Sequence, residues 1–111
     1  MSIDICSMSA AKIAHCISMG ELTAEAVMVS YLDRINARDD VVKSFIDFDA
    51  NRALSLARAS DQQANKGILR GVPFAVKDIF DTFDLPTSWG SPIYARVQPP
   101  RNASCVELLL R

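Results

Sequence analysis

The stretch that decides the fold of this chain is Gly71-Val72-Pro73-Phe74-Ala75-Val76-Lys77-Asp78, an apolar run that ends on one lysine. Its length, and its opening by a glycine and a proline, predict a strand buried on both faces over residues 72–77. A lysine whose ammonium group is stripped of water shifts toward the neutral amine, which can act as a general base. Lys77 is therefore the first candidate for a functional residue.

Two helices are expected in the first third of the chain. Apolar residues recur at helical spacing over residues 10–17, and Gly20 follows as a left-handed stop. A second apolar stripe follows Thr23, which has the character of an N-cap, and continues to about Ile35. These patterns place a short helix and then a longer one before the middle of the chain.

The middle of the chain predicts a strand and a third helix. Residues 41–48 are β-branched and aromatic, which favours a short strand. Asp49 can cap the alanine-rich segment that follows, so a helix is expected from Ala50 to about Gln63, with a small-residue face suited to packing on a sheet.

The last third of the chain is expected to be mostly irregular. Residues 81–100 are rich in Pro, Gly, Ser and Thr, which indicates a connection without regular structure. Asn102 is a candidate cap for a final helix that carries Val106, Leu109 and Leu110. The expected order is helix, helix, strand, helix, strand, loop, helix.

Composition narrows the class of protein. The 111 residues are 50% hydrophobic and carry a formal net charge of -1, which fits one soluble globular domain. The charges are scattered without a basic stripe, so no nucleic acid partner is expected. Asp4 stands where a secretory signal would carry positive charge, and no apolar run approaches the roughly 20 residues of a membrane span. The expectation is a cytoplasmic protein that does not enter a membrane.

The cysteines and the single histidine give no site of their own. Cys6, Cys16 and Cys105 are an odd number at unrelated spacings, so neither a disulfide framework nor a zinc site is indicated, and we expect reduced, mostly buried thiols. His15 lies beside the apolar stripe of the first helix and is expected to be a surface residue. A Cys/His nucleophile pair would need an orienting group and an oxyanion site, and the sequence offers neither.

A calcium site is not expected either, although one short spacing suggests it. Asp47, Asp49 and Asn51 match the first three ligand positions of an EF-hand loop. Arg52 then stands where that loop needs a glycine, and Arg58 where a bidentate glutamate should close the shell. No metal or organic cofactor is implied.

An ordinary structural role for the lysine region has to be weighed against the functional one. A lysine at the end of an apolar strand is usually the point where the strand meets water. Alternation along a strand sends Asp78 to the other side from Lys77, so Asp78 is better placed to brace the following turn than to pair with the lysine. The hydroxyls of the loop can equally be groups that satisfy its backbone; they belong to Thr82, Thr87, Ser88 and Ser91.

The whole pattern nevertheless resembles the N-terminal part of the amidase signature family. The apolar lead-in to Lys77-Asp78 is followed by Asp81-Thr82, by Leu85-Pro86-Thr87-Ser88 and by Gly90-Ser91. A Gly-Glu-Leu-Thr turn at residues 20–23, a strand around Phe45 and an alanine-rich helix occur in the family's order. The resemblance covers nearly the whole chain, and the lysine motif is its most specific part.

This resemblance implies a fold and a chemistry. The fold would be α/β, here the N-terminal part of a sandwich with a mixed central sheet flanked by helices, so that residues 1–111 form an incomplete N-terminal segment of a single amidase domain. Members hydrolyse carbon-nitrogen amide bonds with a serine nucleophile, a second serine in a cis peptide link and a lysine base. By resemblance, Lys77 matches that lysine, and a small-molecule amide is the expected substrate of the longer enzyme.

Two departures from the family's pattern qualify this expectation. Asp84 stands where a glycine is common, and Ser88 where a second threonine is usual, which affects the shape of the loop. The Gly/Ser-rich segment that carries both serines lies downstream of the lysine in this family, and it is not present here. We therefore expect a fragment that is inactive alone, with unpaired strand edges that favour self-association. The alternatives are a non-catalytic remnant or interaction module, and a short hydrolase active by itself.

Overall fold

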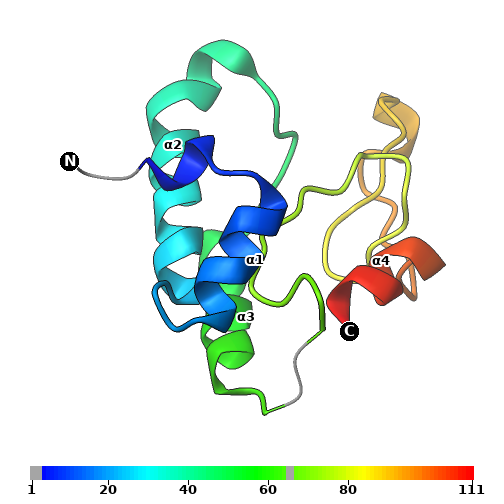
Figure 1. Cartoon of the computed structure of the whole chain (residues 1–111). Coiled ribbons are helices and arrows are strands. Elements are labelled where there is room, and N and C mark those ends of the chain that lie inside the picture. Colours follow the sequence, from blue (N-terminus) through cyan, green and yellow to red (C-terminus); the bar gives the residue numbers. More distant parts are fainter. Residues whose placement is uncertain (1–3, 65–66) are drawn as a thin grey trace. The chain divides into compact units, whose positions relative to one another are not determined.

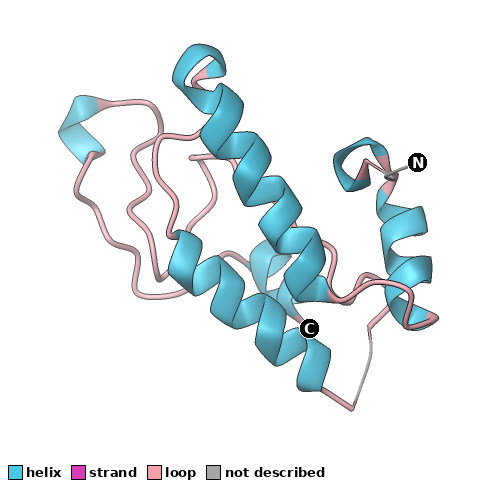
Figure 2. Cartoon of the chain, turned by 90° about the vertical axis from the view of Figure 1, so that its left-hand side faces the viewer, coloured by secondary structure: helices cyan, strands magenta, loops and turns pink. Residues whose placement is uncertain are grey.

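A computed structural model describes residues 4–64 and 67–111. Within these ranges the chain consists of helices and loops and contains no strand (Figure 2). The elements along the chain, labelled in part in Figure 1, are the 3-10 helix η1 (Ile5–Ser7), α1 (Ala10–Ser18), α2 (Ala24–Val42), α3 (Ala50–Gln62), the 3-10 helix η2 (Pro92–Tyr94) and α4 (Ser104–Leu110). The predicted α/β fold with a mixed central sheet is therefore wrong for the described residues.

The strand expected over residues 41–48 is replaced by the end of a helix. Its two leading valines are the last residues of α2, and Lys43 ends that helix in the left-handed conformation, with φ 59°. The Asp39 carboxylate then accepts hydrogen bonds from the backbone N–H groups of Ser44, at 2.7 Å, and Phe45, at 3.3 Å. A β-branched pair at a helix end costs only a few tenths of a kcal/mol, about the size of one helix propensity difference, and this local cap outweighs it.

The second expected strand, over residues 72–77, is a chain segment without a partner strand. A strand exists only as part of a ladder of backbone hydrogen bonds to a neighbour, and no ladder forms among the residues that the structure describes. At its start the N–H of Val72 turns back to the carbonyl of Leu69, at 3.0 Å. Phe74, which a buried strand would enclose, is 40% exposed. The run has the apolar composition of a buried strand, but the prediction that it pairs with another strand is wrong.

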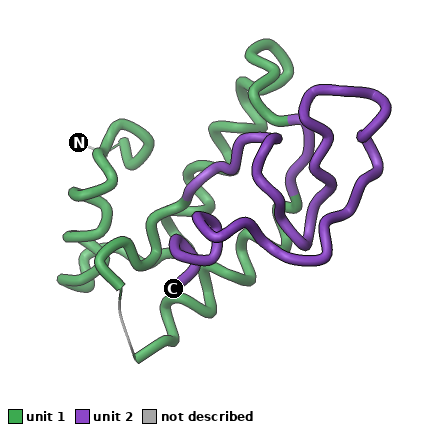
Figure 3. The backbone as a smooth tube through the Cα atoms, turned by 90° about the vertical axis from the view of Figure 1, so that its right-hand side faces the viewer, with its two compact units in different colours: residues 1–45, 49–73 green, residues 46–48, 74–111 purple. Residues whose placement is uncertain are grey.

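Contacts between Cα atoms divide the chain into two compact units (Figure 3). Unit 1 comprises Met1–Phe45 and Asp49–Pro73, and unit 2 comprises Ile46–Phe48 and Phe74–Arg111. The lysine and the loop that follows it thus fall in unit 2, while α1, α2 and α3 fall in unit 1. That residues 1–111 are a segment of one amidase domain stays a prediction.

The helices of unit 1 begin at the residues that the sequence indicated. The side chains of Ser9, Thr23 and Asp49 cap α1, α2 and α3, each accepting a hydrogen bond from a backbone N–H in the first turn. Gly20 follows α1 with φ 74°, the left-handed conformation that favours glycine. Helix α2 is longer than expected, because it runs on past Ile35 to Val42.

An apolar core holds unit 1 together. Its buried members come from α1, α2 and α3, and they are Ile13, Ile17, Ala24, Val27 and Ala57. Helices α2 and α3 pack against each other (Figure 2), so the alanine-rich helix docks on another helix rather than on a sheet. Small residues such as Ala24 and Ala57 allow this close approach.

A carboxylate of α3 also caps α2. Asp61 accepts hydrogen bonds from the N–H of Ala24, at 2.7 Å, and from the N–H of Glu25, at 3.1 Å. Arg58, one turn earlier on α3, forms an ion pair with Glu25, with a distance of 2.7 Å between the guanidinium and the carboxylate. Because the first N–H groups of a helix have no partner within it, these contacts fasten the start of α2 to α3.

Gly71, which opens the expected strand, is required by packing in unit 1. Its φ is 77°, and a Cβ atom built on it would lie 2.7 Å from Cδ1 of Ile17 and 2.9 Å from Cβ of Ala24. Both distances are shorter than side chains tolerate, so only glycine fits here without movement of the core. Gly71, the first residue of the lysine motif, therefore also packs against the core of unit 1.

The remaining expectations concern the histidine, the cysteines, membrane spans and strand edges. His15 is exposed, which confirms the expectation of a surface residue. Cys16 is buried, while Cys6 is half-buried and Cys105 is exposed, contrary to the expectation of mostly buried thiols. All three cysteines are free. Across residues 4–64 and 67–111, every helix is too short or too polar to cross a membrane. The structure has no strand edge in these ranges, and self-association stays a prediction.

Candidate functional site

Lys77 begins a tight turn in unit 2. Its carbonyl oxygen accepts hydrogen bonds from the N–H of Ile79, at 2.7 Å, and from the N–H of Phe80, at 3.0 Å. The side chain of Lys77 is exposed. The prediction of a lysine at the end of a buried strand is therefore wrong for this chain, because no sheet surrounds the segment in the part of the chain that the structure describes. Its assignment as a base stays a prediction.

Asp78, the next residue, holds the loop that returns past the turn. One oxygen of its carboxylate accepts from the N–H of Ser88 at 2.7 Å. The other accepts from the hydroxyl of Ser88 and from the N–H of Gly90, the latter at 3.4 Å. Its carbonyl oxygen accepts from the N–H of Trp89 at 2.9 Å. The prediction that Asp78 braces a turn is in agreement with this geometry, and we call these contacts the Asp78 clamp.

The clamp maintains an unusual backbone at its far end. Trp89 has φ 53° and Gly90 has φ 71°, so two successive residues adopt the left-handed conformation. A residue with a side chain adopts it at a cost of about 1 kcal/mol or more, and the hydrogen bonds to Asp78 offset this cost. The ring of Trp89 lies 5.8 Å from the ring of Tyr94, centre to centre.

These donors also favour the charged form of Asp78. The pKa of the Asp78 carboxyl is lowered below its ordinary value of 3.8. The hydroxyl of Ser88 contributes most to this shift, and the backbone N–H of Ser88 comes next. A carboxylate that accepts several hydrogen bonds is favoured over the neutral acid, which would lose an acceptor. The clamp is therefore built on the charged form of the residue.

The other hydroxyls of the loop have structural partners. Thr82 donates to the carbonyl of Leu85 at 3.2 Å, and Thr87 donates to the carbonyl of Phe80 at 3.5 Å. The hydroxyl of Ser91 accepts from the N–H of Ile93 at 3.3 Å and caps η2. These hydroxyls satisfy backbone groups of the loop, as expected for ordinary loop residues, and none of them is placed to act as a nucleophile.

Two amide side chains that the sequence did not single out in this way complete the network. Gln98 donates to the carbonyl of Phe83 at 2.6 Å and to that of Leu85 at 3.2 Å. Asn102 was expected to cap α4, but Ala103 occupies the cap position. Asn102 instead accepts from the N–H of Phe83 at 2.9 Å and donates to Glu107 at 2.7 Å. The contacts with Phe83 and Leu85 span 13 to 19 residues, so no local pattern could have revealed them.

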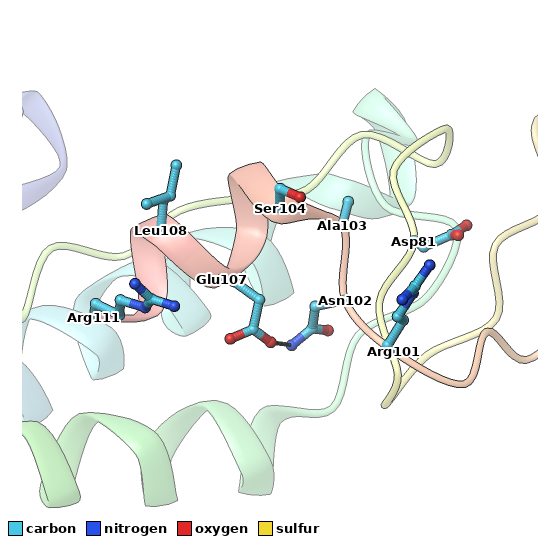
Figure 4. Close-up of a pocket in the computed structure, with 8 residues that line it drawn as sticks. All are labelled: Asp81, Arg101, Asn102, Ala103, Ser104, Glu107, Leu108 and Arg111. Carbon is cyan, nitrogen blue, oxygen red and sulfur yellow. Dashed lines mark hydrogen bonds between the residues drawn. The ribbon is translucent and has the colours of Figure 1, made fainter.

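Unit 2 also contains an open hollow of about 570 Å³ (Figure 4). Acidic and basic side chains line it, and the close-up shows the side chains of Asn102 and Glu107 pointing toward each other and joined by a hydrogen bond. The lining residues are Asp81, Arg101, Asn102, Ala103, Ser104, Glu107, Leu108 and Arg111. Lys77 is not among them, so the hollow is separate from the lysine turn.

The arrangement thus offers one exposed amine on an ordered turn. Within residues 4–64 and 67–111, no three His, Cys, Asp or Glu side chains are grouped so that they could hold a metal ion. The loop around Lys77 is fixed by Asp78, Gln98 and Asn102. Chemistry that uses this amine would need an electrophile or a nucleophile from outside the network.

Comparison with known proteins gives one consistent result. A family model described as Amidase matches residues 26–111. The chain is 42% identical over 110 residues to the A subunit of glutamyl-tRNA(Gln) amidotransferase from Salinispora arenicola, and 43% identical over 110 residues to that from Streptomyces coelicolor. In both cases 96% of this chain but 22% of the relative is covered, so the chain spans about a fifth of their length.

A solved structure agrees with the sequence matches. It is described as "An unexpected vestigial protein complex reveals the evolutionary origins of an s-triazine catabolic enzyme", and it is similar to 93% of this chain with a TM-score of 0.84 and 28% sequence identity. This chain covers 24% of the length of that one. The same arrangement of backbone thus occurs within a chain about four times as long.

Proposed function

Because the chain belongs to the amidase family, we propose that it forms the lysine-bearing, N-terminal part of an amidase in which Lys77 is the general base. The enzyme would hydrolyse carbon-nitrogen amide bonds of a small molecule. The observation that carries this proposal is the family match over residues 26–111, which includes the lysine turn. The proposed protein works in the cytoplasm, in keeping with three free cysteines.

The proposed chemistry assigns Lys77 a proton. As a neutral amine it takes a proton through a bridging serine from the serine that attacks the amide carbon, and backbone N–H groups stabilise the oxyanion. The two serines belong to the part of an amidase that lies outside these 111 residues. That part would also remove Lys77 from water, which favours the neutral amine.

The experiment that tests this role uses an enzyme of full amidase length. Residues 1–111 replace the matching segment of the Streptomyces coelicolor relative, to which this chain is 43% identical, and release of ammonia from glutamine is measured. Lys77→Ala is expected to lower kcat by about a hundred-fold or more, the size of a lost general base. Lys43→Ala, a lysine that ends α2, is the matched control and should leave kcat within about two-fold. Activity retained in Lys77→Ala would refute the role.

A second candidate is narrower. The relatives described above carry the name of the A subunit of glutamyl-tRNA(Gln) amidotransferase and share 42% and 43% of residues with this chain, against 28% for the solved structure. This difference favours a protein that releases ammonia for transfer to a tRNA-bound acid. Turnover of glutamine but not of simple amides by the longer protein would favour this candidate, and the reverse preference would favour a free-standing amidase.

A non-catalytic module is the remaining alternative, and exposed apolar side chains support it. In unit 2 the exposed fractions are 61% for Trp89, 84% for Ile93 and 68% for Leu108. Such side chains could meet a partner chain or a second copy. Size-exclusion chromatography of the 111-residue chain tests this: a dimer or larger species would support the module, and a monomer at all concentrations would oppose it.

A further inference from the structure

We propose that Asp78 is a positioning residue for Lys77: through the clamp, its carboxylate fixes the turn from which the lysine side chain extends. This inference rests on the function proposed above. We assign Asp78 itself no contact with the substrate or the reacting atoms. It acts through the backbone, by joining the lysine turn to residues 88–90.

The backbone is anchored directly after the point where the lysine side chain is attached. The carbonyl of Lys77 closes the turn by accepting from Ile79 and Phe80. The carbonyl of Asp78 accepts from Trp89, and its carboxylate accepts from Ser88. Each of these bonds limits rotation about the dihedral angles next to Lys77. A flexible side chain on a fixed backbone samples far fewer positions than one on a mobile loop.

The clamp lies in a protected part of unit 2. Ser88 is 8% exposed and its neighbour Thr87 is 4% exposed, the two buried polar residues among those described. The side chain of Lys77, by contrast, is exposed. The loop is therefore buried where it is bonded to Asp78 and exposed where the lysine side chain extends. A residue that positions the amine needs this arrangement.

The clamp also depends on the negative charge of Asp78. The donors that the structure gives the Asp78 carboxylate all lie on residues 88–90. An asparagine at position 78 would keep one oxygen acceptor but would set an NH₂ group against the N–H of Gly90. Since two donors cannot share a hydrogen bond, Asp78→Asn should loosen the clamp while preserving the volume of the side chain.

The kinetic test uses the full-length enzyme with residues 1–111 replaced, as above. Asp78→Asn is expected to lower kcat about ten- to a hundred-fold, the effect of an amine misplaced by about 1 Å, with KM within about two-fold. Ser88→Ala, which removes one donor, should lower kcat by less. Asp47→Asn makes the same charge change at an exposed residue of unit 2 and serves as control. An unchanged kcat in Asp78→Asn would overturn the proposal.

A structural test on the 111-residue chain separates failure of the clamp from failure of the enzyme. Trp89 is the only tryptophan, so its fluorescence anisotropy reports on the loop. Asp78→Asn should lower this anisotropy while the helical circular dichroism stays at the level of the parent. Equal loss of both signals would mean a general structural role and would overturn the proposal. If Lys77→Ala remains active, the proposed base is wrong, and the Trp89 signal still decides whether Asp78 holds the loop.

Discussion

The two units of this chain are ordered by different forces. Unit 1 buries five apolar residues of three helices in one cluster. Unit 2 has one buried residue in its helix α4, Val106, and its loop is held by side-chain hydrogen bonds from Asp78, Gln98 and Asn102. Residues around an apolar core need a large free energy for local opening. In a unit held by polar contacts, each segment opens when its own few hydrogen bonds break.

This difference relates structure to the proposed function. In unit 1, apolar residues of three helices pack into one buried cluster, while others such as Val41 and Ile68 stay exposed. In unit 2, aromatic and aliphatic side chains such as Phe83, 49% exposed, and Leu109, 48% exposed, stay at the surface, and this is where the lysine turn lies. Exposed apolar residues of this kind suit a segment that contributes to a larger domain, in keeping with relatives four to five times as long.

The largest expected effect comes from the apolar core. Ile13→Ala removes a side chain that is 1% exposed and should lower the free energy of unfolding by about 3 kcal/mol. Leu108→Ala in unit 2, where the leucine is 68% exposed, should change it by less than about 0.5 kcal/mol. Urea unfolding followed by helical circular dichroism measures both. Equal losses would show that the two units do not differ as described.

The next largest effect concerns the glycine at the end of unit 1. Gly71→Ala combines a left-handed φ with contacts of 2.7 Å and 2.9 Å to Ile17 and Ala24, and should cost about 2–3 kcal/mol. Gly20→Ala is the matched control, since its φ is also left-handed but nothing lies within 4 Å of the added atom. It should cost about 1 kcal/mol. Similar melting temperatures for the two variants would contradict the close approach of Gly71 to the core.

A smaller effect is expected where α3 caps α2. Asp61→Ala leaves the N–H groups of Ala24 and Glu25 without this acceptor and should lower the free energy of unfolding by about 1–2 kcal/mol. Asp33→Ala, at an exposed position of α2, should have little effect. The same urea titrations decide the matter, and an unaffected Asp61→Ala would mean that Thr23 alone caps the helix.

The smallest expected effect is local and depends on pH. The pKa of Asp78 is lowered in the folded chain from its ordinary value of 3.8, so the clamp stabilises the loop fully above that value and loses this contribution as the pH falls through the lower, folded pKa. Trp89 fluorescence should therefore change in this acid range in the parent. Asp78→Asn should lack this transition and Asp47→Asn should keep it; a transition that survives in Asp78→Asn would assign it to another group.

The sequence predicted what local chemistry determines. Thr23 and Asp49, the two expected caps, accept hydrogen bonds from N–H groups three residues away, and such bonds follow from residue type and spacing. Asp78 was likewise expected to brace a turn, and its partners lie 10 to 12 residues away. For the site, therefore, the sequence indicated both the candidate lysine and its neighbour's role.

The strands could not be predicted correctly, for a physical reason. Residues 72–77 have the composition of a buried strand, but a strand needs a partner, and no partner strand is present among the described residues. The contacts of Asp61 and Gln98 span 37 and 13 to 16 residues, so they depend on the tertiary fold. Asn102 was misassigned as a cap because the same donors and acceptors suit a distant backbone group equally well.

The most direct test of the difference between the units is amide hydrogen exchange, resolved by residue, in the parent chain and in Asp78→Asn. We predict that the N–H groups of Ser88 and Trp89 exchange about ten-fold faster or more in the variant, as the clamp opens, while those of Val27 and Ala57 in the apolar core keep their rates. Exchange that rises equally in both units, or nowhere, would contradict the conclusion that Asp78 orders the lysine-bearing unit independently of the helical core.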